Sequence, residues 1–175
     1  MCRTIQRILC AIFIASASTV GMGCSSHPNL TISLADSMKE GGQFRPVTVH
    51  LIGLTQAQHD QWISTTASVD EYFKIGGESE QPMKNKTVLA LNAKNPAFKI
   101  SKDDVGFWGP WKPFDPKNGL RYLFILADLR PAPPGTSGGY EPRRQVLDMS
   151  EGKWKDASEI AVMIDRRTGV GVSAK

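Results

Sequence analysis

The sequence predicts a small β-sandwich that carries one short helical insertion. Short runs in which apolar and polar residues alternate recur along the chain, and segments rich in glycine and proline separate them. No helical pattern stands between each pair of these runs, which disfavours a parallel α/β sheet. The 175 residues suffice for one domain with its own apolar core. We therefore expect about seven to eight short strands in a single mainly β domain.

The N-terminus has the three-part pattern of a secretory signal. Residues 1–7 carry two arginines and no acid, and residues 8–20 are apolar or small throughout. This apolar run is shorter than the roughly 20 residues that a membrane-spanning helix needs. The small residues 21–23 then lead to Cys24. We predict that residues 1–23 form a cleaved signal peptide.

Cys24 is the expected site of a lipid anchor. A cysteine directly after glycine at the end of such a leader resembles the lipobox of bacterial lipoproteins, and Ser25 after it points to the outer membrane. An ordinary signal peptide with a coincidental cysteine is the alternative. Cys2 and Cys10 are lost with the leader, so no disulfide is expected. Residues 24–28 would form a lipidated tether and residues 29–175 the sandwich domain.

The first half of that domain contains two strands and the helical insertion. Leu30–Leu34 alternates as a half-buried strand does, and Pro46 opens a second strand that runs to Leu54. Residues 36–45 between them are polar and glycine-containing, which indicates an exposed loop. Residues 55–64 and 68–73 are predicted as short helices. Their expected N-caps are Thr55 and Ser68, the latter with Glu71 in a capping box.

The second half is predicted to be all β. Residues 120–127 are apolar on both faces, which is typical of a central strand. The other predicted strands are 87–91, 144–149, 159–165 and 168–172, the last two forming a hairpin. Residues 93–119, with four prolines, and residues 131–142 are predicted to be irregular.

Residues able to carry chemistry are few. The three histidines do not stand at metal-ligand spacing with a cysteine or carboxylate, and we expect His50 to be a solvated residue on the polar side of its strand. Asp103-Asp104 is better explained as a helix or turn cap than as a pair of catalytic acids, and residues 135–139 as a flexible loop. We expect no enzyme activity, no cofactor and no metal.

Two further features leave alternatives open. Trp108 and Trp111 stand in an aromatic segment held by proline, where they could anchor a partner or fold back over an open end of the sandwich. The doublets Arg143-Arg144 and Arg166-Arg167 could face anionic lipid head groups or acidic residues of a partner, or simply be solvated. The net charge of +4 is too low and too dispersed to suggest a nucleic-acid partner.

Several short motifs stand in a distinctive order. Cys24-Ser25-Ser26 leads into a strand after the leader, and Arg45-Pro46 precedes a valine-rich strand. Asp70–Phe73, Tyr122–Arg130 and the closing hairpin Ala161–Val172 follow. This order resembles that of the outer-membrane lipoproteins of type VI secretion systems, the TssJ type, although the first loop lacks the family's Asn-Pro-Asp.

This resemblance implies a transthyretin-like, immunoglobulin-like sandwich with a structural role. The protein would sit at the periplasmic face of the outer membrane through acylated Cys24 and bind the periplasmic part of an inner-membrane secretion protein. The family makes that contact through its first loop. The corresponding residues here are Met38, Lys39, Glu40, Phe44 and Arg45, with Trp108 and Trp111 as a second contact. The alternative is a lipoprotein binding module whose Trp-rich loop holds a small ligand, glycan or peptide.

Overall fold

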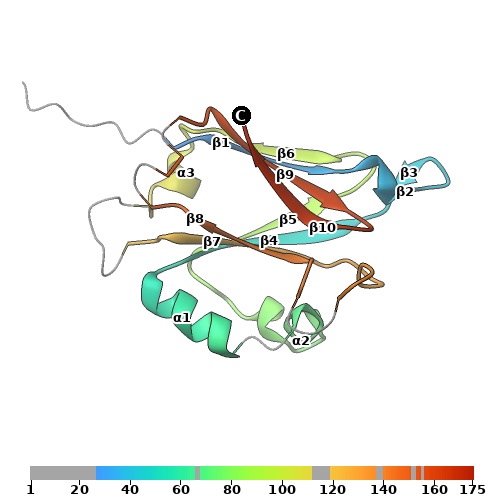
Figure 1. Ribbon diagram of the computed structural model, residues 1–175, viewed down its shortest axis with the longest axis horizontal. Coiled ribbons are helices and arrows are strands. Elements are labelled where there is room, and N and C mark those ends of the chain that lie inside the picture. Colours follow the sequence, from blue (N-terminus) through green and yellow to red (C-terminus); the bar gives the residue numbers. More distant parts are fainter. Residues whose placement is uncertain (1–26, 66–67, 112–118, 137–139, 151–152, 155) are drawn as a thin grey trace, which may run out of the picture.

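The computed structural model describes residues 27–65, 68–111, 119–136, 140–150, 153–154 and 156–175. Two four-stranded sheets lie face to face, and two helices cover the outer face of one of them (Figure 1). Cys24 and part of the 135–139 loop lie outside the described residues. The elements in chain order are β1 (Asn29–Leu34), η1 (Asp36–Met38), β2 (Lys39–Glu40), β3 (Gln43–Phe44), β4 (Val47–Leu54), α1 (Gln56–Thr65), α2 (Val69–Phe73), η2 (Glu78–Glu80), β5 (Lys86–Leu91), β6 (Ala97–Ile100), α3 (Val105–Trp108), β7 (Tyr122–Ala127), β8 (Arg144–Asp148), β9 (Glu159–Asp165) and β10 (Gly169–Ala174).

The predicted mainly β sandwich with a helical insertion is confirmed. One sheet has the strand order β10-β9-β1-β6, and the other has the order β5-β4-β7-β8. All neighbours are antiparallel except β1 and β9, where Leu30 pairs with Ile160 and Leu34 with Ile164. Alternate residues of the facing strands point inward and fill the space between the sheets, as in other sandwiches. Leu30, Ile32, Leu51, Ile125, Ile160 and Ile164 are among these buried residues.

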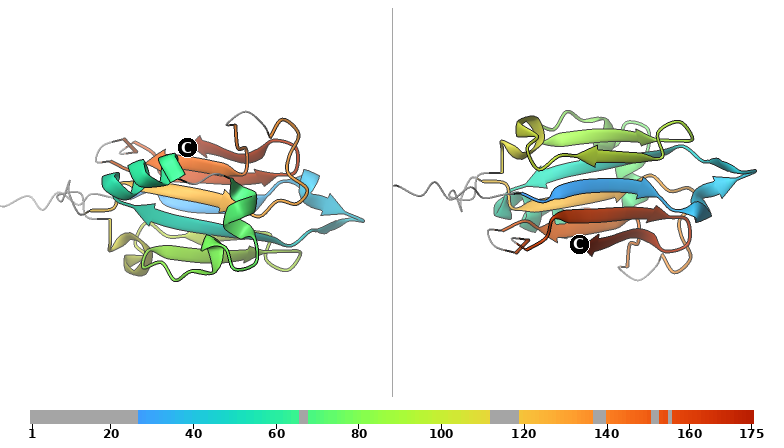
Figure 2. Two further views of the ribbon diagram at one scale, coloured as in Figure 1. Left: turned by 90° about the horizontal axis from the view of Figure 1, so that it is seen from below. Right: turned by 90° about the horizontal axis from the view of Figure 1, so that it is seen from above.

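A second apolar layer lies beneath the helices. The face of β4 and β7 that points away from the other sheet presents Ile52, Leu54, Phe124 and Leu126, and α1 and α2 cross this face (Figure 2). Val69 and Tyr72 of α2 complete the cluster. Both faces of β4 and β7 are therefore buried, which confirms residues 120–127 as the site of a central strand.

The helical insertion begins as the sequence indicates. Thr55 and Gln58 cap α1 reciprocally, because the Gln58 amide donates to the Thr55 hydroxyl and the Thr55 amide to the Gln58 side chain. The Ser68 hydroxyl accepts the Glu71 amide at the start of α2. The predicted helix starts and the cap at Ser68 are thus confirmed.

The prediction that residues 93–119 are irregular is wrong for their first half. β6 adds a fourth strand to the first sheet by pairing with β1, and α3 follows it. Asp104 is the N-cap of α3, and its carboxylate accepts the Phe107 amide at 3.1 Å. This confirms that Asp104 is a helix cap.

Candidate partner-binding surface

The β2–β3 hairpin forms the end of the molecule opposite to α3 (Figure 1). Gly41 and Gly42 make its turn with positive φ angles of 59° and 81°, which glycine adopts without strain. No other part of the described chain lies within 4 Å of either glycine's Cβ position. The hairpin therefore projects into solvent.

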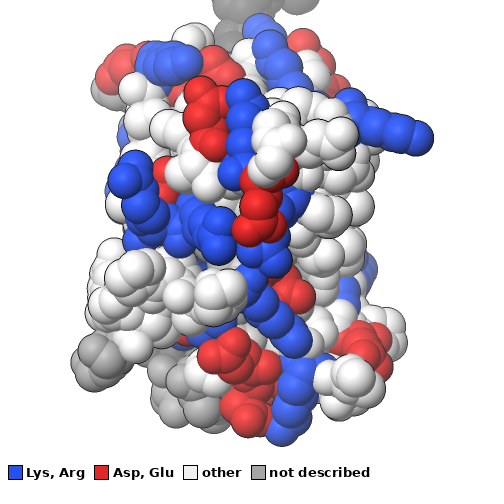
Figure 3. All heavy atoms as spheres, turned by 90° about the vertical axis from the view of Figure 1, so that its right-hand side faces the viewer, with Lys and Arg blue, Asp and Glu red and all other residues white. Residues whose placement is uncertain are grey.

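Both signs of charge alternate along this hairpin. Lys39 pairs with Asp36 at 2.7 Å, and Glu40 pairs with Arg45 at 3.4 Å and with Arg166 at 3.5 Å. The hydrogen bond from Lys39 lowers the pKa of Asp36. Figure 3 shows basic and acidic side chains interspersed over this end of the molecule. Exposed pairs of this kind stabilise the fold little, so they remain free to exchange partners.

The base of the hairpin is fixed to the β9–β10 turn. The Ser37 hydroxyl donates to the Asp165 carboxylate at 2.7 Å and accepts the Arg166 amide at 3.2 Å. Burial acts to raise the pKa of Asp165, but the hydrogen bonds from Ser37 and from the turn amides outweigh it and hold this pKa low. The ionised carboxylate therefore organises the turn.

The prediction that Met38 is an exposed anchor is wrong. Its side chain is only 3% exposed and belongs to the core between the sheets. Phe44 is half-buried and packs against the same core, while the Lys39 ammonium lies 4.9 Å from its ring centroid. Of the residues expected to meet a partner, Lys39 and Glu40 are exposed and Arg45 is partly exposed.

The two tryptophans of the second expected contact are also buried. Trp108 is 4% and Trp111 is 5% exposed. They pack against each other and against Phe107 at one end of the sandwich, and the Trp108 indole N–H donates to the Ser101 carbonyl at 3.0 Å. This arrangement agrees with the interpretation in which both tryptophans fold back over an open end of the sandwich. Neither indole is available at the surface for a partner.

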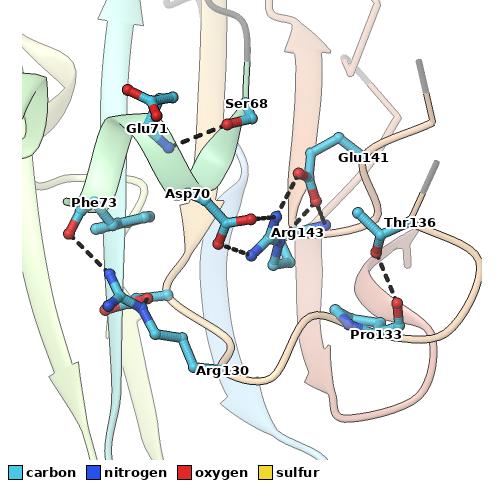
Figure 4. Close-up of polar contacts among 10 residues, drawn as sticks. Ser68, Asp70, Glu71, Phe73, Arg130, Pro133, Thr136, Glu141 and Arg143 are labelled. Atoms are coloured by element: carbon cyan, nitrogen blue, oxygen red, sulfur yellow. Dashed lines mark hydrogen bonds and ion pairs between the residues drawn. The ribbon is translucent and has the colours of Figure 1, made fainter. Parts of the chain in front are cut away.

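Arg143 is a buried cation, so it is neither solvated nor open to a lipid or a partner, which were the two alternatives for its doublet. Its side chain lies between two carboxylates and donates to both oxygens of Asp70 and to both oxygens of Glu141 (Figure 4). These contacts raise the pKa of Arg143 and lower the pKa of Asp70. Arg130 makes a second link to α2 by donating to the Phe73 carbonyl at 2.8 Å. The two arginines thus fasten α2 to the loop between β7 and β8.

His50 is buried rather than solvated, because α2 covers the face of β4 that carries it. Its Nδ1 lies 2.8 Å from the Tyr72 hydroxyl, and Phe73 packs edge-on against its ring. Burial and, to a lesser degree, the charge of Lys86 lower the pKa of His50 to about 4, although Asp128 acts in the opposite sense. The histidine is a neutral core residue at pH 7.

This burial predicts a loss of stability in mild acid. Unfolding restores the ordinary pKa of about 6.5 to His50, so the unfolded chain takes up a proton that the folded chain refuses. The stabilisation that depends on neutral His50 is complete above pH 6.5 and is lost as the pH falls toward 4. The free energy of unfolding should therefore fall by about 2 kcal/mol between pH 7 and pH 5. Urea denaturation at both pH values measures it. Over the same pH range the free energy of unfolding of His50→Gln should fall by about 2 kcal/mol less than that of the wild type. Equal losses in the two proteins would show that His50 does not cause this pH dependence.

The described residues hold no group of three or more histidine, cysteine or acidic side chains arranged to bind a metal ion. Within the same residues, no helix has the length and apolar character needed to cross a membrane.

Three solved structures are similar to this fold. The C-terminal domain of the type VI secretion protein TssM from EAEC is 11% identical with a TM-score of 0.49, over 84% of this chain and 100% of that chain. Lip from Serratia marcescens, a membrane-bound component of the type VI secretion system, is 9% identical with a TM-score of 0.49, over 84% and 96%. The type VI lipoprotein TssJ1 from Pseudomonas aeruginosa is 15% identical with a TM-score of 0.39, over 85% and 96%. No family model and no curated protein matches the sequence.

Proposed function

We propose that this chain is a non-enzymatic lipoprotein of a type VI secretion membrane complex. Acylated Cys24 would hold it in the outer membrane, and the β2–β3 hairpin would bind the periplasmic part of an inner-membrane partner. Support comes from the leader that ends at Cys24 and from the motifs that resemble the TssJ type. These motifs fall, in the same order, on β1, β4, α2, β7 and the β9–β10 hairpin.

The position of the first described residue, at the end of the domain opposite to the hairpin, carries this proposal. The described chain starts at His27, whose ring stacks on Trp108, the last residue of α3. β1 then runs from Asn29 to Leu34 toward the hairpin, a distance of about 17 Å at 3.3 Å per residue. An anchor at one end and an exposed, charged hairpin at the other suit a protein that reaches from a membrane toward a partner.

The alternative of a Trp-rich binding loop loses its support. The interpretation required tryptophan side chains at the surface, but both Trp108 and Trp111 are in the core. Nothing else in the described residues favours a small-ligand module over a protein-binding one.

The anchor is tested by Cys24→Ser. We expect the wild-type chain to fractionate with membranes and to begin at an acylated Cys24, as intact-mass spectrometry can verify. The variant should be released into the soluble fraction or remain unprocessed, because the lipid supplies the affinity for the bilayer. Normal maturation and unchanged membrane association of Cys24→Ser would refute lipid anchoring at this residue.

The hairpin is tested by the double variant Lys39→Ser, Glu40→Ser. Both side chains are exposed and Met38 is retained, so the fold should be preserved. Partner recovery by affinity purification should fall at least tenfold, or about 1.4 kcal/mol. Lys102→Ser, Asp103→Ser removes an equivalent exposed pair at the α3 end and should leave recovery unchanged. Equal recovery with both double variants would move the contact away from the hairpin.

A further inference from the structure

The end of the molecule at α3 carries an uncharged, exposed cap. Val105 is 79% exposed, and Gly106, Gly109 and Pro110 beside it are exposed as well. Trp108 and Trp111, in the same segment, are buried in the core. The segment therefore combines core residues with exposed, uncharged ones.

This α3 cap is held rigidly. Asp104 caps the helix, and the Trp108 indole is fixed by its hydrogen bond to Ser101. At Gly109 a Cβ atom would lie 2.4 Å from the Val105 carbonyl oxygen, so a larger residue would force the turn open. The exposed position of Val105 is thus set by the fold and is not that of a mobile loop.

The first described residue lies beside this cap. His27 stacks on the Trp108 ring with the centroids 4.7 Å apart, and Pro28 is buried. Cys24 precedes His27 by three residues, so its Cα lies at most about 11 Å from that of His27. A lipid attached at Cys24 would bring a bilayer surface close to His27, and therefore close to α3, whose Trp108 stacks on the His27 ring.

We propose that the α3 cap, residues 105–110, rests in the interface of the bilayer that holds the lipid anchor. The inference depends on the proposed acylation of Cys24. The described charges directly before the cap, Lys102 with Asp103 and Asp104, have no net positive sum, so the proposed contact is apolar. The anchor keeps the cap at high local concentration near the membrane, where a weak contact suffices. Two points of attachment then orient the domain with its β2–β3 hairpin pointing away from the bilayer.

A single fluorescent probe at position 105 tests this contact. In the processed, lipidated chain Cys2 and Cys10 are absent and the Cys24 sulfur is blocked, so Val105→Cys supplies the one free thiol. This variant is labelled with an environment-sensitive dye and reconstituted into phosphatidylcholine vesicles. The dye at position 105 should emit at a shorter wavelength than a dye at Gln43→Cys. Brominated lipid should also quench it several-fold more. Gln43 is exposed in the hairpin and serves as the matched control.

The outcomes separate this inference from the proposed function. If intact-mass spectrometry finds Cys24 without acyl chains, lipid anchoring fails and the membrane contact fails with it. If Cys24 is acylated but the dye at position 105 is as water-exposed as the dye at position 43, the contact alone is overturned. Quenching that appears only in anionic vesicles, or that disappears in high salt, would also overturn an apolar contact.

Discussion

Replacing Arg143 with methionine is expected to destabilise the domain by about 3 kcal/mol, within the range for breaking a buried ion pair. The arginine is 1% exposed, and its removal leaves Glu141 with a largely buried, unpaired carboxylate. Asp70, whose side chain is 65% exposed, can return to water at little cost. The loss also releases α2 from the loop between β7 and β8, so His50 should become more accessible. Urea denaturation gives the free energy of unfolding.

Arg166→Met is the matched control for this effect. Arg166 also pairs with a glutamate, but both partners are exposed, so the expected loss is below about 1 kcal/mol. Arg143→Lys keeps the charge without the planar fork that reaches both carboxylates, and should fall between the two. Equal stability of the two methionine variants would show that the Arg143 cluster does not fasten the helical layer.

Ile125→Asp is expected to unfold the domain at 25 °C. Ile125 is fully buried in β7, between the two sheets. A carboxylate there would have no partner, and the resulting cost, more than about 4 kcal/mol, is a large fraction of the stability of an ordinary domain. Circular dichroism and thermal denaturation report the loss directly.

Two further variants keep this prediction measurable when the aspartate variant does not fold. Ile125→Val removes one methylene group and should cost about 1 kcal/mol in a folded protein. Val88→Asp introduces the same charge on β5 at an exposed position and should change stability by about 0.5 kcal/mol or less. A melting temperature unaffected by Ile125→Asp would remove β7 from the core.

The strands with clear apolar periodicity could be predicted from the sequence, and those without it could not. β1, β4, β7 and the β9–β10 hairpin alternate or are apolar on both faces, so their burial pattern is visible in the residues. β6 has four residues, Ala97–Ile100, and follows Pro96. A strand of this length has too few apolar–polar alternations to be distinguished from the loop around it. Its place is decided by pairing with β1, which is a tertiary contact.

The candidate site could also be predicted only in part from the sequence. The loop 36–45 and its charged residues were evident, because glycines and polar residues mark an exposed connection. The burial of Met38 was not, because a single methionine in a polar loop carries no periodicity. The burial of His50 and Arg143 is not visible in the sequence for a related reason. Both are buried beside α2, and nothing in the sequence places this helix against β4 or sets Asp70 opposite Arg143.

Site-specific crosslinking in living cells tests the proposed function most directly. A photoreactive amino acid replaces Gln43 in the hairpin or, for comparison, Val105 at the opposite end, and crosslinked products are identified by mass spectrometry. We expect position 43 to crosslink to an inner-membrane protein of the secretion complex and position 105 not to do so. A lipidated, folded protein whose position 43 never crosslinks to such a protein, or whose position 105 does so instead, would contradict the account.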